Sequence, residues 1–142
     1  MAEADGKVAF ELVSPERLLI SKPVEMVVVP GDEGDFGVLP GHAPLISELR
    51  SWVLEVYDAG QVSERVFVAG GFAEVTAERC TVLAEEAVAL AEASAADAEA
   101  RLKRAEQAVD DARDEDERAP AEAERARAQA LVEALAYYGA GR

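Results

Sequence analysis

Residues 52–69 read WVLEVYDAGQVSERVFVA, and this stretch decides the fold of the first part of the chain. Apolar and polar residues alternate from Trp52 to Asp58 and again from Val62 to Ala69, which is the period of a half-buried β-strand. Ala59-Gly60-Gln61 between them has the length and the glycine of a hairpin loop. The stretch therefore predicts two antiparallel strands joined by a tight turn.

Further short runs of β-favouring residues lie on both sides of this hairpin, with glycine and proline between them. They cover residues 8–13, 17–21 and 24–29 before it and residues 72–76 and 80–84 after it. Many short strands at this spacing are typical of a sandwich or a barrel. About 85 residues can close one small core of this kind.

The composition changes near Glu86, and the second part of the chain is predicted to be helical. Nine alanines occur in residues 1–85 and twenty in residues 86–142. Apolar residues recur at helical spacing along two segments, on Ala98, Leu102, Ala105, Val109 and Ala112 and on Ala128, Leu131, Leu135 and Tyr138. Ser94 is a suitable N-cap for the first helix, and Pro120 fits the first turn of the second. We therefore expect a β-sandwich domain at 1–87 and an antiparallel two-helix hairpin at 88–142.

Alanine is the most frequent residue of the two helical stripes, which limits how strongly the hairpin can pack. Burying a methyl group contributes far less than burying a leucine, at roughly 25 cal/mol per Å². The hairpin is therefore either a docking element that leans reversibly on a partner or a stable structural appendage, and the spacing alone does not separate the two.

Charge and composition exclude several classes of partner. The chain of 142 residues has 29 acidic and 14 basic side chains, a net charge of −15, which disfavours nucleic acid and anionic membrane surfaces. The longest apolar run, Val24 to Pro30, is far shorter than the ~20 residues that span a bilayer, so no membrane insertion is expected. The polar start from Met1 to Lys7 predicts no secretory signal.

Candidate chemistry is sparse. His42 is the sole histidine and no Gly-x-Ser-x-Gly elbow accompanies it, so nucleophilic catalysis is not expected. Cys80, the sole cysteine, falls in a predicted strand as a buried, inert thiol. The acids of residues 32–35 lack the spacing of an EF-hand loop. We predict no catalytic residue, no metal site and no cofactor.

Residues 34–41 are the least generic part of the chain. Three glycines, a proline and three large apolar residues share eight positions beside acidic side chains. Rigid turns that present apolar side chains next to acids suggest a protein contact surface. An inward-packed corner of the sandwich is the alternative.

Three stretches resemble a known family. They are GDFGVLPGHAPLIS at residues 34–47, FVAGGFAEV at residues 67–75 and VLAEEA at residues 82–87. They are similar to the signature loop, the second conserved stretch and the end of the first domain of the epsilon subunit of the rotary F-type ATP synthase. The opening FELVSPE at residues 10–16 is also typical of that family. The β half, the alanine-rich hairpin and the length of the chain all fit, so the resemblance covers the whole chain.

The resemblance implies a fold and a role. The fold is a ten-stranded β-sandwich followed by a two-helix C-terminal hairpin. The role is that of a non-catalytic central-stalk subunit that turns with the rotor and couples proton flow to ATP synthesis. The implied partners are the gamma subunit and the membrane rotor ring of c subunits, with the alpha/beta catalytic head as a further partner of the hairpin. The implied location is peripheral, on the cytoplasmic face of the bacterial inner membrane.

The resemblance also assigns contact residues by position. Ser14, His42 and Ser47 match places where the family meets gamma. Asp35 matches the place where it meets the ring, and we expect Phe36 and Leu39 to add apolar area to that contact.

Two features depart from the family pattern in the hairpin. Some bacterial members bind ATP there, and Ser94 and Asp97 stand where those members carry Asp and Arg. Some members inhibit ATP hydrolysis by docking positive charge, whereas residues 86–142 carry fourteen acids and eight bases, a net −6. We therefore predict no nucleotide binding and weak regulation. A ligand-binding β-sandwich module with a helical interaction appendage is the alternative function.

Overall fold

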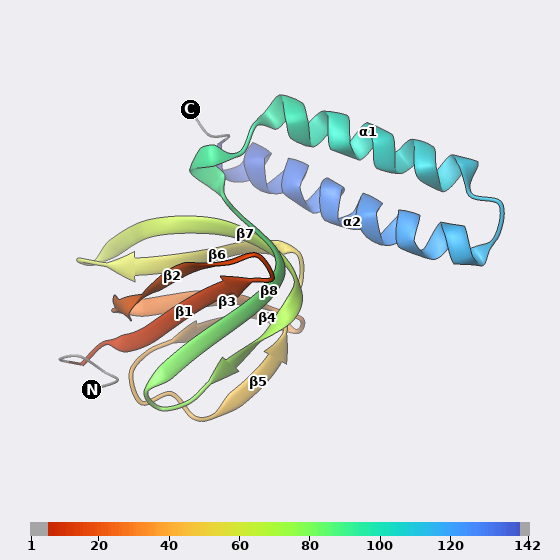
Figure 1. Ribbon diagram of the computed structural model, residues 1–142. Helices are drawn as coiled ribbons and strands as arrows, with labels where there is room; N and C mark the ends of the chain where they lie inside the picture. The colour runs from red at the N-terminus through yellow and green to blue at the C-terminus, as the bar shows by residue number, and fades with distance from the viewer. Residues whose placement is uncertain (1–5, 140–142) are drawn as a thin grey trace. The chain divides into compact units, whose positions relative to one another are not determined.

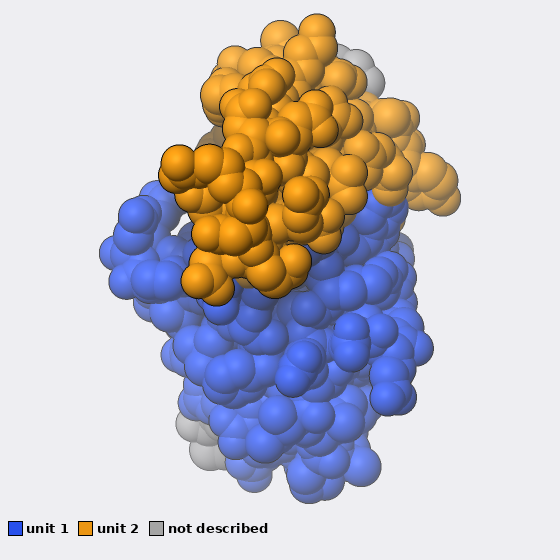
Figure 2. Space-filling model, turned by 90° about the vertical axis from the view of Figure 1, so that its right-hand side faces the viewer, with its two compact units in different colours: residues 1–89 blue, residues 90–142 orange. Residues whose placement is uncertain are grey.

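The computed structural model describes residues 6–139, which form an all-β part followed by two helices (Figure 1). Two compact units divide at Ala89 and Leu90, coloured separately in Figure 2, two residues beyond the boundary expected from composition. The strands are β1 Val8–Ser14, β2 Arg17–Val24, β3 Met26–Gly31, β4 Gly34–Val38, β5 Leu45–Glu48, β6 Trp52–Asp58, β7 Gln61–Val75 and β8 Arg79–Ala89. A short 3-10 turn at Leu90–Glu92 precedes helices α1 Ala95–Asp111 and α2 Glu115–Tyr138.

The strands form one hydrogen-bonded sheet in the order β2-β1-β8-β7-β6-β3-β4, with β5 paired to β7 beside that path. The sheet folds over on itself into a sandwich (Figure 1). The predicted hairpin of β6 and β7 is present, with Trp52 opposite Val68 and Asp58 opposite Gln61. β1 pairs with β8 in parallel, so the sheet is mixed.

The prediction of ten strands is wrong, because the described residues form eight. The sequence divides residues 61–76 at Gly70-Gly71, but β7 runs through both glycines without ending. Residues 61–68 of β7 pair with β6 and residues 72–75 with β5, while β8 pairs with residues 66–75. Two long strands therefore serve both layers of the sandwich.

Gly70-Gly71 is the place where the ladder between β7 and β8 is interrupted without a change of register. Ala69 pairs with Glu86 and Gly71 with Ala84, which leaves Gly70 outside the ladder. Gly71 has φ 105°, and a Cβ there would lie 1.9 Å from the carbonyl oxygen of Leu83. Only glycine fits at a position where a strand with positive φ lies so close to its neighbour.

The core of the first unit is apolar throughout. Phe10, Leu12 and Leu54 are among its largest fully buried side chains, and no polar or charged residue among residues 6–139 is buried. Cys80 is buried in this core, as the alternation of β8 predicts. The sandwich thus provides a rigid frame for the loops at its edges.

The two helices pack along the predicted stripes. Ala98, Leu102, Ala105 and Val109 are buried on α1, and Ala128, Leu131, Ala134 and Leu135 are buried on α2. Ser94 caps α1 by accepting a hydrogen bond from the Asp97 amide at 3.2 Å. The start expected for α2 is wrong, because the helix begins at Glu115 and Pro120 lies inside it. Asp114 caps this earlier start, and the acids of the first turn complement the helix dipole.

Candidate interaction surface

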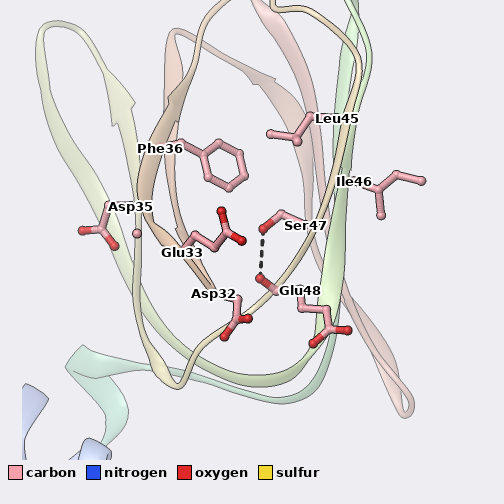
Figure 3. A pocket seen from close by; sticks show the side chains of 9 residues that line it. Asp32, Glu33, Asp35, Phe36, Leu45, Ile46, Ser47 and Glu48 are labelled. Atoms are coloured by element: carbon pink, nitrogen blue, oxygen red, sulfur yellow. Dashed lines mark hydrogen bonds between the residues drawn. The ribbon is translucent and has the colours of Figure 1, made fainter.

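Residues 34–38 form strand β4 and residues 45–48 form strand β5, and the sequence predicted neither strand. β4 and the turn before it face β5 across an open hollow of about 500 Å³, the acidic hollow, shown in Figure 3. It is lined by Asp32, Glu33, Gly34, Asp35, Phe36, Leu45, Ile46, Ser47 and Glu48. Four carboxylates and three apolar side chains therefore share one surface, which combines charge with area for a protein partner.

Gly31 brings the walls of the acidic hollow together. A Cβ at this position would lie 2.8 Å from the Gly34 carbonyl oxygen, 2.9 Å from the Phe36 ring and 3.0 Å from the Ser47 hydroxyl. No side chain fits there without displacing backbone, so glycine is required for β3, β4 and β5 to meet.

The acids of the hollow point in different directions. In Figure 3 the Glu33 carboxylate reaches toward Ser47, whereas Asp35 points away from the hollow. Asp35 Oδ1 instead accepts a hydrogen bond from Arg50 Nη1 at 2.6 Å. The residue expected to meet the ring thus already has an ionic partner within the chain.

The other two residues of the expected ring contact lie differently. Phe36 is half-buried and packs against the core of the sandwich. Leu39 is 55% exposed but lies outside the lining of the acidic hollow. Ile46 is 69% exposed on the β5 side and was not singled out from the sequence. The sequence did not predict strand β5, to which Ile46 belongs, and this strand places its side chain on the surface.

His42 belongs to the loop between β4 and β5. Its ring centroid lies 6.4 Å from that of Phe36, and its Nδ1 is 2.6 Å from the Ala43 carbonyl oxygen, which an Nδ1–H tautomer satisfies. The Gly41 amide ties this loop to the Ala77 carbonyl at 2.8 Å. The His42 ring thus contacts Phe36 and its own loop, and the Gly41 amide ties that loop to the turn before β8.

Ser14 lies in a second hollow of about 370 Å³, lined by Val13, Ser14, Pro15, Gly71, Phe72, Leu83, Ala84 and Glu85. The structure therefore separates Ser14 from Ser47, which lines the acidic hollow. The three positions expected to meet gamma do not form one cluster.

An apolar row crosses the face beside Ser14. Pairing of the strands places Phe72 opposite Leu83, Leu83 opposite Val13 and Val13 opposite Leu18. Phe72, Leu83 and Leu18 are 39%, 38% and 55% exposed. Sequence reasoning missed this row because alternation gives the two faces of each strand but not which strands are neighbours.

The described residues offer little chemistry. No group of three or more histidine, cysteine, aspartate or glutamate side chains among residues 6–139 could hold a metal ion. Burial raises the pKa of the Cys80 thiol to about 12, so it is protonated at neutral pH.

Ser94, which was expected to replace a nucleotide-binding Asp, has a structural role at the start of α1. The Ser94 hydroxyl accepts the Asp97 amide hydrogen bond that caps α1.

The described helices include none that is long and apolar enough to cross a membrane.

Comparison with known proteins places the chain among ATP synthase subunits. A family model described as the β-sandwich domain of the ATP synthase delta/epsilon chain matches residues 7–90. ATP synthase epsilon chains of Rhodospirillum rubrum and Rhodospirillum centenum are 69% and 66% identical over 74 and 79 residues. These matches cover 52% and 54% of this chain, and the chain spans about half the length of these relatives, at 55% and 54%.

Two solved assemblies contain a chain of similar fold. One is the Euglena gracilis mitochondrial ATP synthase, OSCP/F1/c-ring in rotational state 1, with 26% identity and a TM-score of 0.77. That similarity covers 92% of this chain and 82% of the other. The other is the central stalk and c-ring of the Tetrahymena thermophila mitochondrial ATP synthase, with 11% identity, a TM-score of 0.63 and coverage of 91% and 98%. This second likeness is one of fold.

Proposed function

Because the chain belongs to the ATP synthase delta/epsilon chain family, we propose that it is the epsilon subunit of an F-type ATP synthase. In this role it is a non-catalytic part of the central stalk that turns with the rotor and couples proton flow through the membrane ring to ATP synthesis. The observation that carries the proposal is the family match over residues 7–90, which include every strand and both hollows. The similar chain in an F1/c-ring assembly supports it.

The acidic hollow is the part of this subunit that we assign to the rotor ring. Its carboxylates can pair with basic side chains, and Ile46 adds exposed apolar area beside them. Asp35 and Phe36 belong to this assignment, and Leu39 contributes from the adjoining loop. Phe36→Ala is a poor test because Phe36 packs against the core, so its loss also affects folding.

The apolar row of Phe72, Leu83, Val13 and Leu18 is the part that we assign to the gamma subunit. Ser14 borders this row within the second hollow, which supports its expected contact with gamma. His42 and Ser47 are assigned to the same partner, and because Ser47 lines the acidic hollow, this assignment brings gamma and the ring together at that hollow. Exposed apolar side chains in a continuous row are suited to a lasting contact with another subunit.

The hairpin has a weaker role in this proposal. Its net charge of −6 opposes docking on an acidic segment of the alpha/beta head, so inhibition of ATP hydrolysis is slight. The subunit is peripheral and works at the cytoplasmic face of a bacterial inner membrane, held there by gamma and the ring.

Recovery of partners from solubilised membranes tests the proposed function. A tagged full-length chain should recover gamma, the ring and the alpha/beta head together. Ile46→Asp should reduce recovery of the ring. Gln61→Asp, a change at the turn between β6 and β7, should leave that recovery unchanged. A chain that recovers none of these subunits would overturn the proposal.

A further inference from the structure

Backbone contacts tie the acidic turn to the segment after β5. β3 ends at Gly31 and β4 begins at Gly34, so Asp32 and Glu33 form a two-residue turn. The Asp32 amide donates to the Glu48 carbonyl at 2.8 Å, and the Arg50 amide donates to the Pro30 carbonyl at 3.0 Å. The turn therefore rests on the chain that runs from β5 to β6.

The Arg50 side chain joins both strands of this turn. Its Nη1 donates to Asp35 Oδ1 at 2.6 Å and to the Gly31 carbonyl oxygen at 3.3 Å. Gly31 lies on β3 and Asp35 on β4, one on each side of the turn. One guanidinium thus links β3 and β4 at the base of the turn, and this link acts as a clamp on the turn.

The remaining acids of the turn are left for another contact. Asp32 and Glu33 are exposed, and neither carboxylate makes an ion pair or hydrogen bond within residues 6–139. Asp35 is 47% exposed on its side chain but is engaged by Arg50. The charge of Asp35 is therefore partly neutralised, whereas those of the turn itself are not.

From this geometry we infer that Arg50 is a positioning residue for the ring contact, and that Asp35 acts through Arg50 rather than by touching the ring. The inference rests on the proposed function, because it assigns roles within the acidic hollow. Arg50 fixes the direction in which Asp32 and Glu33 present their charges. Loss of either member of the pair loosens the same turn and weakens the same contact.

A direct contact between Asp35 and the ring predicts a different effect of Arg50→Ala on the affinity for the stalk. If Asp35 paired directly with the ring, Arg50 would compete for its carboxylate, and Arg50→Ala would leave binding unchanged or make it tighter. If Arg50 positions the turn, Arg50→Ala weakens binding. The direction of one measurement thus separates the two roles.

The experiment measures the affinity of the full-length chain for a purified stalk of gamma and the rotor ring. We expect Asp35→Ala and Arg50→Ala each to weaken binding by about two- to fivefold, the range of one exposed ion pair. The double variant should bind no more weakly than either single one, because both changes remove one clamp. Arg50→Lys should recover part of the affinity, and Asp35→Asn most of it, because its amide oxygen still accepts from Arg50.

The matched control is Arg65→Ala. Arg65 donates to Glu55 at 2.8 Å from a side chain 40% exposed, close to the 37% of Arg50, but lies far along β7 from the acidic turn. It should leave the affinity for the stalk unchanged. All variants should unfold within about 2 °C of the parent chain, since an exposed pair contributes little to global stability.

Amide hydrogen exchange on the free chain tests the positioning role without a partner. Arg50→Ala and Asp35→Ala should both speed exchange of the Asp32 amide by about two- to fivefold, whereas Glu33→Ala should not. Unchanged exchange overturns the inference, and so does tighter binding of Arg50→Ala to the stalk. Failure of the unaltered chain to bind the stalk overturns the proposed function and, with it, the ring contact that Arg50 would serve.

Discussion

Arg101 of α1 and Glu124 of α2 form a two-pronged ion pair, with Nε to Oε2 at 2.7 Å and Nη2 to Oε1 at 3.0 Å. The residues are 23 positions apart, so the pair links the two helices of the hairpin directly. The hydrogen bonds from Arg101 hold the pKa of the Glu124 carboxyl below its ordinary value of 4.5. Half of the buried residues of the two helices are alanines, so the pair adds a specific contact to a small apolar interface.

Breaking this pair should loosen the hairpin by a modest amount. We expect Arg101→Gln to cost about 1 kcal/mol, because the Glu124 side chain is 44% exposed and solvent screens the attraction. Urea unfolding of the full chain, followed by helical circular dichroism, measures the change. Arg113→Gln is the control, since Arg113 lies in the connection between the helices, is 84% exposed and pairs with Glu117 in the first turn of α2, so its loss should shift the midpoint less. Equal shifts in both variants would contradict a special role for the interhelix pair.

The same pair should make the hairpin sensitive to acid. Because the folded-state pKa of Glu124 is lowered, its contribution is complete above the unfolded-state value of about 4.5 and is lost as the pH falls through the lower folded-state pKa. The difference in stability between the parent chain and Glu124→Gln should therefore be present at pH 7 and vanish near pH 2. A difference that is the same at both values would show that the ion pair is not its source.

Gly71→Ala should be severely destabilising. The new Cβ would lie 1.9 Å from the Leu83 carbonyl oxygen, and the residue would also keep a φ of 105°. We expect a loss of more than about 3 kcal/mol or failure to fold, because backbone must move. Gly60→Ala separates the two causes, since Gly60 has φ 76° with open space around it. That control should cost only about 1–2 kcal/mol, and an equal loss at both positions would exclude the steric explanation.

Cys80 should resist thiol reagents in the folded chain. Its pKa of about 12 leaves almost no thiolate at pH 8, and the side chain has no exposed surface. Reaction with a disulfide reagent should be absent in native buffer and complete in urea. Glu78→Cys, which adds a thiol at the exposed turn before β8, should react at once as a control. Fast modification of Cys80 in the native chain would show that β8 opens readily.

The hairpin should neither bind ATP nor control hydrolysis strongly. The Ser94 hydroxyl is engaged in capping α1, and Asp97 places a negative charge where a phosphate would need a positive one. Calorimetric titration of the full chain with millimolar MgATP should show no saturable heat. Removal of residues 92–142 should leave ATP hydrolysis by the assembled enzyme nearly unchanged. A saturable isotherm or a several-fold rise in hydrolysis would direct attention to Arg101, Lys103, Arg104 and Arg113.

The sequence by itself determined the order of the two units and the elements with a clear period. The alternation in residues 52–69 predicted the hairpin of β6 and β7, and the stripe of Ala98, Leu102, Ala105 and Val109 predicted the buried face of α1. Ser94 was identified as a helix cap from its residue type and place. These features are local, because each depends on residues within a few turns or strands of one another.

The tertiary structure decided what depends on neighbours distant in sequence. Gly70-Gly71 looked like the end of a strand, but pairing with β5, β6 and β8 continues β7 through both glycines. The described residues therefore form eight strands where ten were expected. Residues 34–38 looked like part of a turn because of Gly34 and Gly37, and residues 45–48 were not predicted as a strand, yet their partners make both segments strands.

The surface was settled in the same way. The row from Phe72 to Leu18 exists only because four strands meet in one register, and the engagement of Asp35 by Arg50 joins residues 15 positions apart. Local pattern fixes which side of a strand is apolar, whereas long-range pairing fixes which strands and charges meet, because those contacts form only when the chain closes on itself.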